Sequence, residues 1–213
     1  MNAPGKSTRR PGVPPPQDNL DRARELGFEA LLEQPEEQIA WLGAHAAPGG
    51  WCLPVLGDEL YVDPTARKVT TPDFRPIGLP WSILALHYLA IPGRPESQPP
   101  QVTFADLPTA RSYASVYQGR VIARLCATAG RDIDKLRAAA EGLGAVAAEG
   151  GDAAFDFHPF PRLTLRLIWH APDEEFPPSA TLLLPANIEQ HFSSEDIVVL
   201  SECLVSRLGG RPF

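Results

Sequence analysis

The sequence predicts an α+β fold, in which helices pack on one face of an antiparallel sheet. Two strands with alternating apolar side chains are expected at residues 155–157 and 163–169, and an amphipathic helix is expected at 195–208. Together these patterns favour a layer of helices on a sheet. Residues 18–213 are predicted to form one domain. They follow a tail at 1–17 that is rich in Pro, Gly and basic residues and is predicted to be disordered.

An alternative organisation divides the chain at its proline-rich stretch, residues 92–101. An N-terminal helical and hairpin part would then cover residues 18–92, and a C-terminal core would cover 102–213. The chain has 24 prolines among its 213 residues, which predicts many loops and short elements in either case.

The first part of the chain is expected to contain three helices and a hairpin. Pro35 suits the first position of a helix. His45 is expected near the end of that helix, where it interacts with the helix dipole, with a role as a ligand as the alternative. His87 lies in a helix that is apolar nearly all round. We therefore expect a core histidine whose ring nitrogens have hydrogen-bond partners, with a buried functional histidine as the alternative. The predicted elements are helices at 18–33, 36–45 and 81–90 and strands at 59–62 and 67–70.

The second part is expected to alternate helices with short strands. Ser193 or Ser194 suits an N-cap, and the acidic Glu195 and Asp196 suit the first turn of the helix that follows. Gly209 is expected to end that helix. The predicted elements are helices at 112–127, 131–143 and 195–208 and strands at 155–157, 163–169 and 181–184.

A hairpin centred on Phe160 is predicted to place Phe157 opposite Leu163. The prolines in residues 158–162 cannot donate ladder hydrogen bonds, so pairing is expected to stop there. Side chains alternate along each strand, which assigns one apolar face to the hairpin. That face comprises Phe155, Phe157, Leu163, Leu165, Leu167 and Trp169.

The opposite face of this hairpin is polar. In the predicted register Asp156 lies opposite Thr164 and diagonal to Arg166. One interpretation is a solvated face with a weak ion pair, worth roughly 0–1 kcal/mol. The other is a ligand-binding face, whose polar contacts would be Asp156, His158, Arg166 and His170.

An acidic run follows these strands, and Phe176 is expected to anchor its loop in the core. The run is either an exposed charge cluster or a source of oxygen ligands for a cation. Histidine and carboxylate side chains are the right types of metal ligand, although their spacing matches no known metal motif. The candidate metal ligands are His158, His170, Asp173, Glu174, Glu175 and His191.

Composition disfavours several classes of partner. The net charge is −7 and the basic residues are scattered, which disfavours nucleic acid. No apolar run approaches the ~18–20 residues of a membrane span, and the basic N-terminus lacks the apolar region of a signal peptide. A cytoplasmic location is therefore expected.

The three cysteines, Cys52, Cys126 and Cys203, stand far apart and form no CxxC motif. The sequence therefore contains neither a zinc-ribbon motif nor a ferredoxin-type iron–sulphur motif. An odd cysteine count suggests a reducing compartment. Neither the glycine-rich phosphate-binding motifs nor GxSxG or HExxH occur, so no hydrolase nucleophile or zinc-protease signature is recognised.

Five segments between residues 81 and 208 carry a family resemblance: LALHYL at 84–89, FADLP at 104–108, GDAAF at 151–155, FPRL at 160–163 and DEEFPP at 173–178. They resemble an uncharacterised prokaryotic family of domains of unknown function, best represented in anaerobes. Some members are fused to iron–sulphur domains or lie near corrinoid metabolism. The resemblance implies a ligand site without an established activity. A metal ion or a tetrapyrrole-type cofactor is expected, while the missing cysteine cluster argues against iron–sulphur chemistry here.

Three functions follow from these observations. The first is a non-catalytic protein that binds a small molecule or cofactor on the polar sheet face. The second is a metal-binding protein or metal-dependent enzyme that uses the His, Asp and Glu ligands named above. The third is an assembly partner whose Phe160 and Phe176 lie at loop tips, a pattern typical of protein interaction surfaces.

Overall fold

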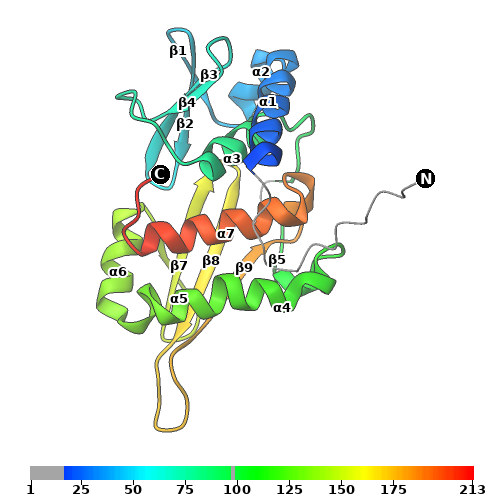
Figure 1. Ribbon diagram of the computed structural model, residues 1–213. Coiled ribbons are helices and arrows are strands. Elements are labelled where there is room, and N and C mark those ends of the chain that lie inside the picture. The colour runs from blue at the N-terminus through cyan, green and yellow to red at the C-terminus, as the bar shows by residue number, and fades with distance from the viewer. Residues whose placement is uncertain (1–16, 97–98) are drawn as a thin grey trace, which may run out of the picture.

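The computed structural model describes residues 17–96 and 99–213, and it confirms the α+β fold (Figure 1). Two antiparallel sheets are present, with strand orders β1-β2-β3-β4 and β5-β9-β8-β7-β6. The tail predicted at 1–17 lies outside the described residues except at Gln17, where α1 begins. Within the described ranges, no helix combines the length and apolarity needed to cross a membrane.

The four-stranded sheet forms from three consecutive hairpins. It contains the predicted hairpin of residues 59–62 and 67–70 and two further strands that were not predicted. Its strands are β1 (His45–Ala47), β2 (Gly50–Val55), β3 (Asp58–Asp63) and β4 (Lys68–Thr70).

The helix predicted at 36–45 was too long. α2 spans Glu36–Trp41, and Gly43 then takes a left-handed φ of 94°. A helix cannot continue through this conformation, which glycine adopts readily. His45 therefore lies in β1, and the expected interaction with a helix dipole was wrong.

The register predicted for the central hairpin was wrong by two residues. Phe157 pairs with Leu165 and Asp156 pairs with Arg166, because the first strand continues past Phe157 to Phe160 with an irregularity between them. A shift of two residues leaves every side chain on its predicted face. The strands of this sheet are β5 (Gln101–Thr103), β6 (Val146–Ala148), β7 (Ala153–Phe160), β8 (Leu163–His170) and β9 (Ser179–Pro185).

One face of the five-stranded sheet is covered by helices α4 to α7 (Figure 1). All six residues of the predicted apolar face are buried there, and Trp169 Nε1 donates a 2.8 Å hydrogen bond to the Gly130 carbonyl. The strand predicted at 181–184 is present in β9, and its side chains alternate between the two faces of the sheet. Leu182 and Leu184 are buried, while Thr181 and Leu183 are partly exposed on the opposite face.

The predicted helices are present with shifted ends, and the stretch expected as one helix at 112–127 is divided. Ser193 caps α7 in a capping box with Asp196, as its sequence indicates. The helices are α1 (Gln17–Glu33), α2, α3 (Leu79–Leu89), α4 (Ala114–Tyr117), α5 (Arg124–Ala127), α6 (Ile133–Gly142) and α7 (Ser194–Leu208), with a π-helical segment at Gln118–Ala123 and 3₁₀ turns at Phe104–Asp106, Arg111–Tyr113, Ala129–Arg131 and Ile188–Gln190.

The tip of the β7–β8 hairpin packs into the N-terminal part of the chain. Phe160 is fully buried and stacks on Tyr88 with ring centroids 4.5 Å apart. Arg162 lies over the Trp41 ring, 4.6 Å from its centroid. The expectation that Phe160 lies at an exposed loop tip was therefore wrong, because this end of the hairpin packs against α2 and α3 in the core.

Candidate metal centre

The four residues predicted to bind a ligand lie along the uncovered face of β7 and β8. Asp156 and Arg166 form a two-fold ion pair, with both N–O distances 2.7 Å. Hydrogen bonding to the Asp156 carboxylate raises the pKa of Arg166. Their polar groups therefore satisfy each other, and a ligand on this face stays a prediction.

His158 and His170 lie at opposite ends of this face. His158 Nδ1 is 3.2 Å from the Thr164 hydroxyl, whereas His170 ends β8. Thr164 and His170 are six positions apart in β8, which separates the histidines by about 20 Å at about 3.4 Å per residue. The structure does not bring these two histidines to a common ion.

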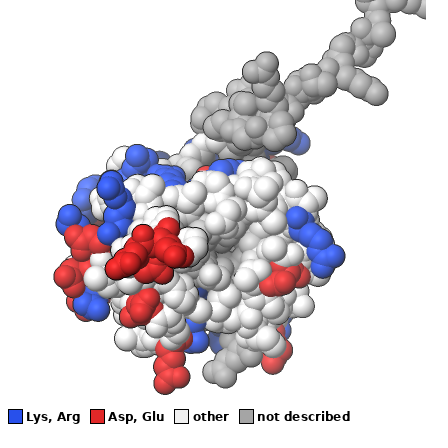
Figure 2. Space-filling view, turned by 90° about the horizontal axis from the view of Figure 1, so that it is seen from below, with Lys and Arg blue, Asp and Glu red and all other residues white. Residues whose placement is uncertain are grey.

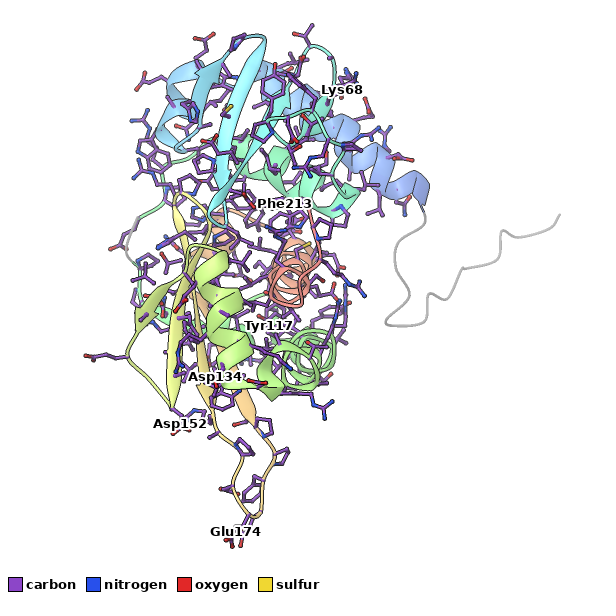
Figure 3. The ribbon with its side chains drawn as sticks, turned by 90° about the vertical axis from the view of Figure 1, so that its left-hand side faces the viewer. Lys68, Tyr117, Asp134, Asp152, Glu174 and Phe213 are labelled. Atoms are coloured by element: carbon purple, nitrogen blue, oxygen red, sulfur yellow. The ribbon has the colours of Figure 1, made fainter. Side chains whose placement is uncertain are left out.

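The acidic run lies at the end of an exposed arm, residues 171–178, which connects β8 to β9. Figure 3 shows Glu174 at the far end of this arm, and Figure 2 looks onto the acidic side chains there. Asp173 Oδ1 accepts hydrogen bonds from the Glu175 and Phe176 amides, at 2.8 and 2.7 Å. Phe176 is 66% exposed, so it does not anchor the arm in the core as expected.

The remaining candidate, His191, is buried in the connection between β9 and α7. Burial lowers its pKa, and its Nδ1 has no hydrogen-bond partner among the described residues. The six candidate metal ligands thus occupy separate regions: one sheet face, the arm and the interior.

A different set of metal-ligand side chains converges on the four-stranded sheet. His45 from β1, Cys52 from β2 and Glu59 from β3 place their donor atoms within 4.8 Å of one another. His45 Nε2 lies 3.7 Å from Glu59 Oε1. His45 is exposed and the other two are partly buried, so the cluster is open to solvent on one side.

Strand alternation and register produce this convergence. Leu53 and Leu60 point into the core, so Cys52 and Glu59, one position away on each strand, point to the outer face. His45 pairs directly with Cys52, whereas Glu59 lies diagonal to Cys52 across β2 and β3.

The turn between β2 and β3 places Glu59 diagonal to Cys52. Leu56 and Gly57 connect the strands with φ angles of 49° and 75°. Two positive φ angles in a two-residue connection are typical of a tight β-hairpin turn. This turn places Pro54 opposite Glu59 and Cys52 opposite Tyr61.

The electrostatics of the cluster favour a cation. In the described part of the chain, the only ion-pairing partner of Glu59 is His45, at a distance longer than a hydrogen bond. Burial raises the pKa of the Cys52 thiol, and the Glu59 carboxylate raises it further. A cation between the three donors would reverse this effect by stabilising the thiolate.

Sequence reasoning missed this site because it placed His45 in a helix and treated Cys52 as isolated. One signal was available. A spacing of seven residues separates His45 from Cys52 and Cys52 from Glu59. If residues 45–63 are assigned as short consecutive hairpins, this spacing places the three side chains on neighbouring strands.

Comparison with known families supports the sequence resemblance. Residues 34–207, most of the chain, match the family described as "Domain of unknown function (DUF3786)". The chain belongs to this family. The DUF3786 region begins well before residue 81, where the resemblance was expected to start, and it includes the whole His45, Cys52 and Glu59 cluster. Comparison with curated proteins and with solved structures finds no match.

Proposed function

We propose that this protein binds a divalent transition-metal ion at His45, Cys52 and Glu59, and that Zn²⁺ is the ion these donors fit best. The observation that carries the proposal is the convergence of three different donor types, from three strands, within 4.8 Å. The proposal keeps the metal-binding function expected from the sequence but assigns it to other residues.

The donor chemistry supports zinc. Imidazole nitrogen, thiolate sulphur and carboxylate oxygen all ligate Zn²⁺, whereas Mg²⁺ and Ca²⁺ select oxygen alone. Two donors that are each about 2.05 Å from a tetrahedral zinc are about 3.3 Å apart. The 3.7 Å separation of His45 Nε2 and Glu59 Oε1 requires only a small movement of these two side chains toward each other.

Three protein ligands leave one tetrahedral position open. Structural zinc sites use four protein ligands, while sites that exchange ligands or act on substrates keep a position for water. The exposure of His45 agrees with such an open site. Binding would displace the Cys52 proton, because a thiol ligates zinc as the thiolate.

Zinc titration of chelator-treated full-length protein tests the proposal. Isothermal titration calorimetry is expected to give one Zn²⁺ per chain. Cys52→Ser and Glu59→Gln are each expected to weaken binding by at least about tenfold, since even outer-shell changes cost about 10–100-fold.

Cys126→Ser is the matched control. Cys126 is a partly buried cysteine on α5, so this variant loses one thiol without touching the cluster. Its zinc affinity is expected to equal that of the wild type. Wild-type affinity in Cys52→Ser, with circular dichroism showing an intact fold, would refute the assignment.

A further inference from the structure

Glu59, one of the three proposed metal ligands, also lines a groove of about 730 Å³. The groove is bounded by the start of β3, the loop that follows β4 and the segment after α7. Figure 3 shows Phe213, which lines the groove, at the boundary between the two sheets. Small-molecule sites commonly have volumes of about 300–1,000 Å³.

One wall of the groove is held by Arg207 and Phe213. The Arg207 guanidinium lies over the Phe213 ring, 4.1 Å from its centroid, and donates a 2.9 Å hydrogen bond to Asp58. Phe213 also packs edge-on against Trp81, with ring centroids 5.1 Å apart. This wall is therefore formed before any ligand arrives.

The loop after β4 forms the other wall, and Thr71 orders it. The Thr71 hydroxyl donates a 2.6 Å hydrogen bond to Asp73 and accepts one of 3.0 Å from the Arg75 amide. Arg75 Nε lies 2.6 Å from Asp73 Oδ2. The two terminal nitrogens of Arg75 form no hydrogen bond with the described residues, and its side chain is 74% exposed.

Two ion pairs line the groove. Asp58 pairs with Arg207, and Asp73 pairs with Arg75. A divalent ion held by a thiolate and a carboxylate is also neutral, because +2 is offset by −1 twice. A singly charged ligand therefore suits this site better than a multiply charged one. Pro72, Pro76 and Ile77 supply an apolar surface between the charged groups.

We infer that the groove binds a small monocarboxylate with a compact apolar or aromatic body, and this inference rests on the proposed metal site. The carboxylate would fill the open metal position, and the body would lie against Ile77 and Phe213. The free terminal nitrogens of Arg75 can donate to the carboxylate or to an adjacent carbonyl, because planar guanidinium groups recognise such acceptors.

Ligand-observed NMR with two probes, acetate and 3-phenylpropionate, tests this inference on full-length protein loaded with Zn²⁺. Both acids offer the same donor, but only the second has a body that the groove would bury. We expect 3-phenylpropionate to bind at least about tenfold more tightly than acetate. Removal of zinc is expected to abolish binding of both.

Two variants locate the binding. Arg75→Gln leaves the metal ligands intact. It is expected to lower the affinity for 3-phenylpropionate several-fold and to leave the affinity for zinc unchanged. Arg137→Gln, an exposed change on α6, is the matched control and is expected to bind as the wild type does.

The outcomes separate the two proposals. Stoichiometric zinc without preference for 3-phenylpropionate, or equal binding to metal-free protein, would overturn the groove inference and leave the metal site standing. Wild-type binding in Arg75→Gln would likewise overturn the groove assignment. Failure to bind zinc would overturn the metal site, and the groove inference would fall with it.

Discussion

His87 Nδ1 lies 3.1 Å from Asp196 Oδ1, and this pair joins α3 to the first turn of α7. Asp196 also accepts hydrogen bonds from the Ser193 hydroxyl and amide, at 2.7 and 3.2 Å. Burial alone would raise the pKa of Asp196, but the hydrogen bonds from His87 and Ser193 outweigh burial and lower it. His87 is therefore paired at the core boundary.

The lowered pKa of Asp196 predicts an acid-sensitive contribution to stability. The contribution is present above the unfolded-state pKa, about 3.9, and is lost as pH falls through the lower folded-state pKa. Asp196→Asn is expected to reduce the free energy of unfolding by about 1–2 kcal/mol at pH 7 and by less near pH 3. Urea unfolding at several pH values measures this.

Asp134→Asn is the control, because Asp134 is an exposed carboxylate on α6. It is expected to change stability by less than about 0.5 kcal/mol at either pH. An equal loss at pH 7 and pH 3 in Asp196→Asn would contradict the role of its charge.

The Tyr88 hydroxyl links the N-terminal part to the β7–β8 hairpin. It donates to the Leu42 carbonyl at 2.7 Å and accepts from the Arg162 amide at 3.1 Å. Tyr88→Phe leaves both backbone groups without this partner. It is expected to lower the free energy of unfolding, measured by chemical denaturation, by about 1–3 kcal/mol. Phe176→Ser, on the exposed arm, is expected to cost less than about 0.5 kcal/mol. A similar cost in both variants would contradict this assignment of core and surface.

Two glycines are expected to respond oppositely to alanine. At Gly43 the φ of 94° is unfavourable for alanine, and its Cβ would lie 2.7 Å from Pro161 Cγ. Gly43→Ala is therefore expected to lower the melting temperature, with a cost of at least about 1–3 kcal/mol. Gly142 lies in α6 with open space around it, so Gly142→Ala is expected to raise the free energy of unfolding by about 0.5–1 kcal/mol. Stabilisation by Gly43→Ala would show that Gly43 does not adopt this left-handed conformation in solution.

The Asp156 and Arg166 pair tests the polar face of the five-stranded sheet. Directly paired strand positions with two 2.7 Å contacts predict a coupling free energy of about 0.5–1 kcal/mol. A double-mutant cycle with Asp156→Asn and Arg166→Gln, followed by urea unfolding, measures it. Coupling near zero would favour a fully solvated face.

Patterns within single elements were predictable from the sequence. The alternation of Phe155, Phe157, Leu165 and Leu167 assigned their face correctly even though the strand pairing was shifted, because a two-residue shift preserves the side-chain period. The cap at Ser193 was equally local, since its partners lie within one helical turn.

Relationships between elements were not predictable in the same way. The end of α2 depends on the left-handed Gly43 and on its contact with Pro161, more than a hundred residues away in the chain. The strand register depended on an irregularity that begins after Phe157. Neither leaves a periodic trace in the sequence, so the expected helix was too long and the expected pairing was displaced.

The sequence by itself determined the α+β class, the buried face of the central hairpin and the capped final helix, because these follow from side-chain periodicity and local hydrogen bonding. Only the tertiary structure decided which polar residues meet. It separated His158, His170 and the acidic arm, and it brought His45, Cys52 and Glu59 together. The physical reason is that a binding site requires donors from several strands, and their distances depend on turns and registers that involve the whole fold.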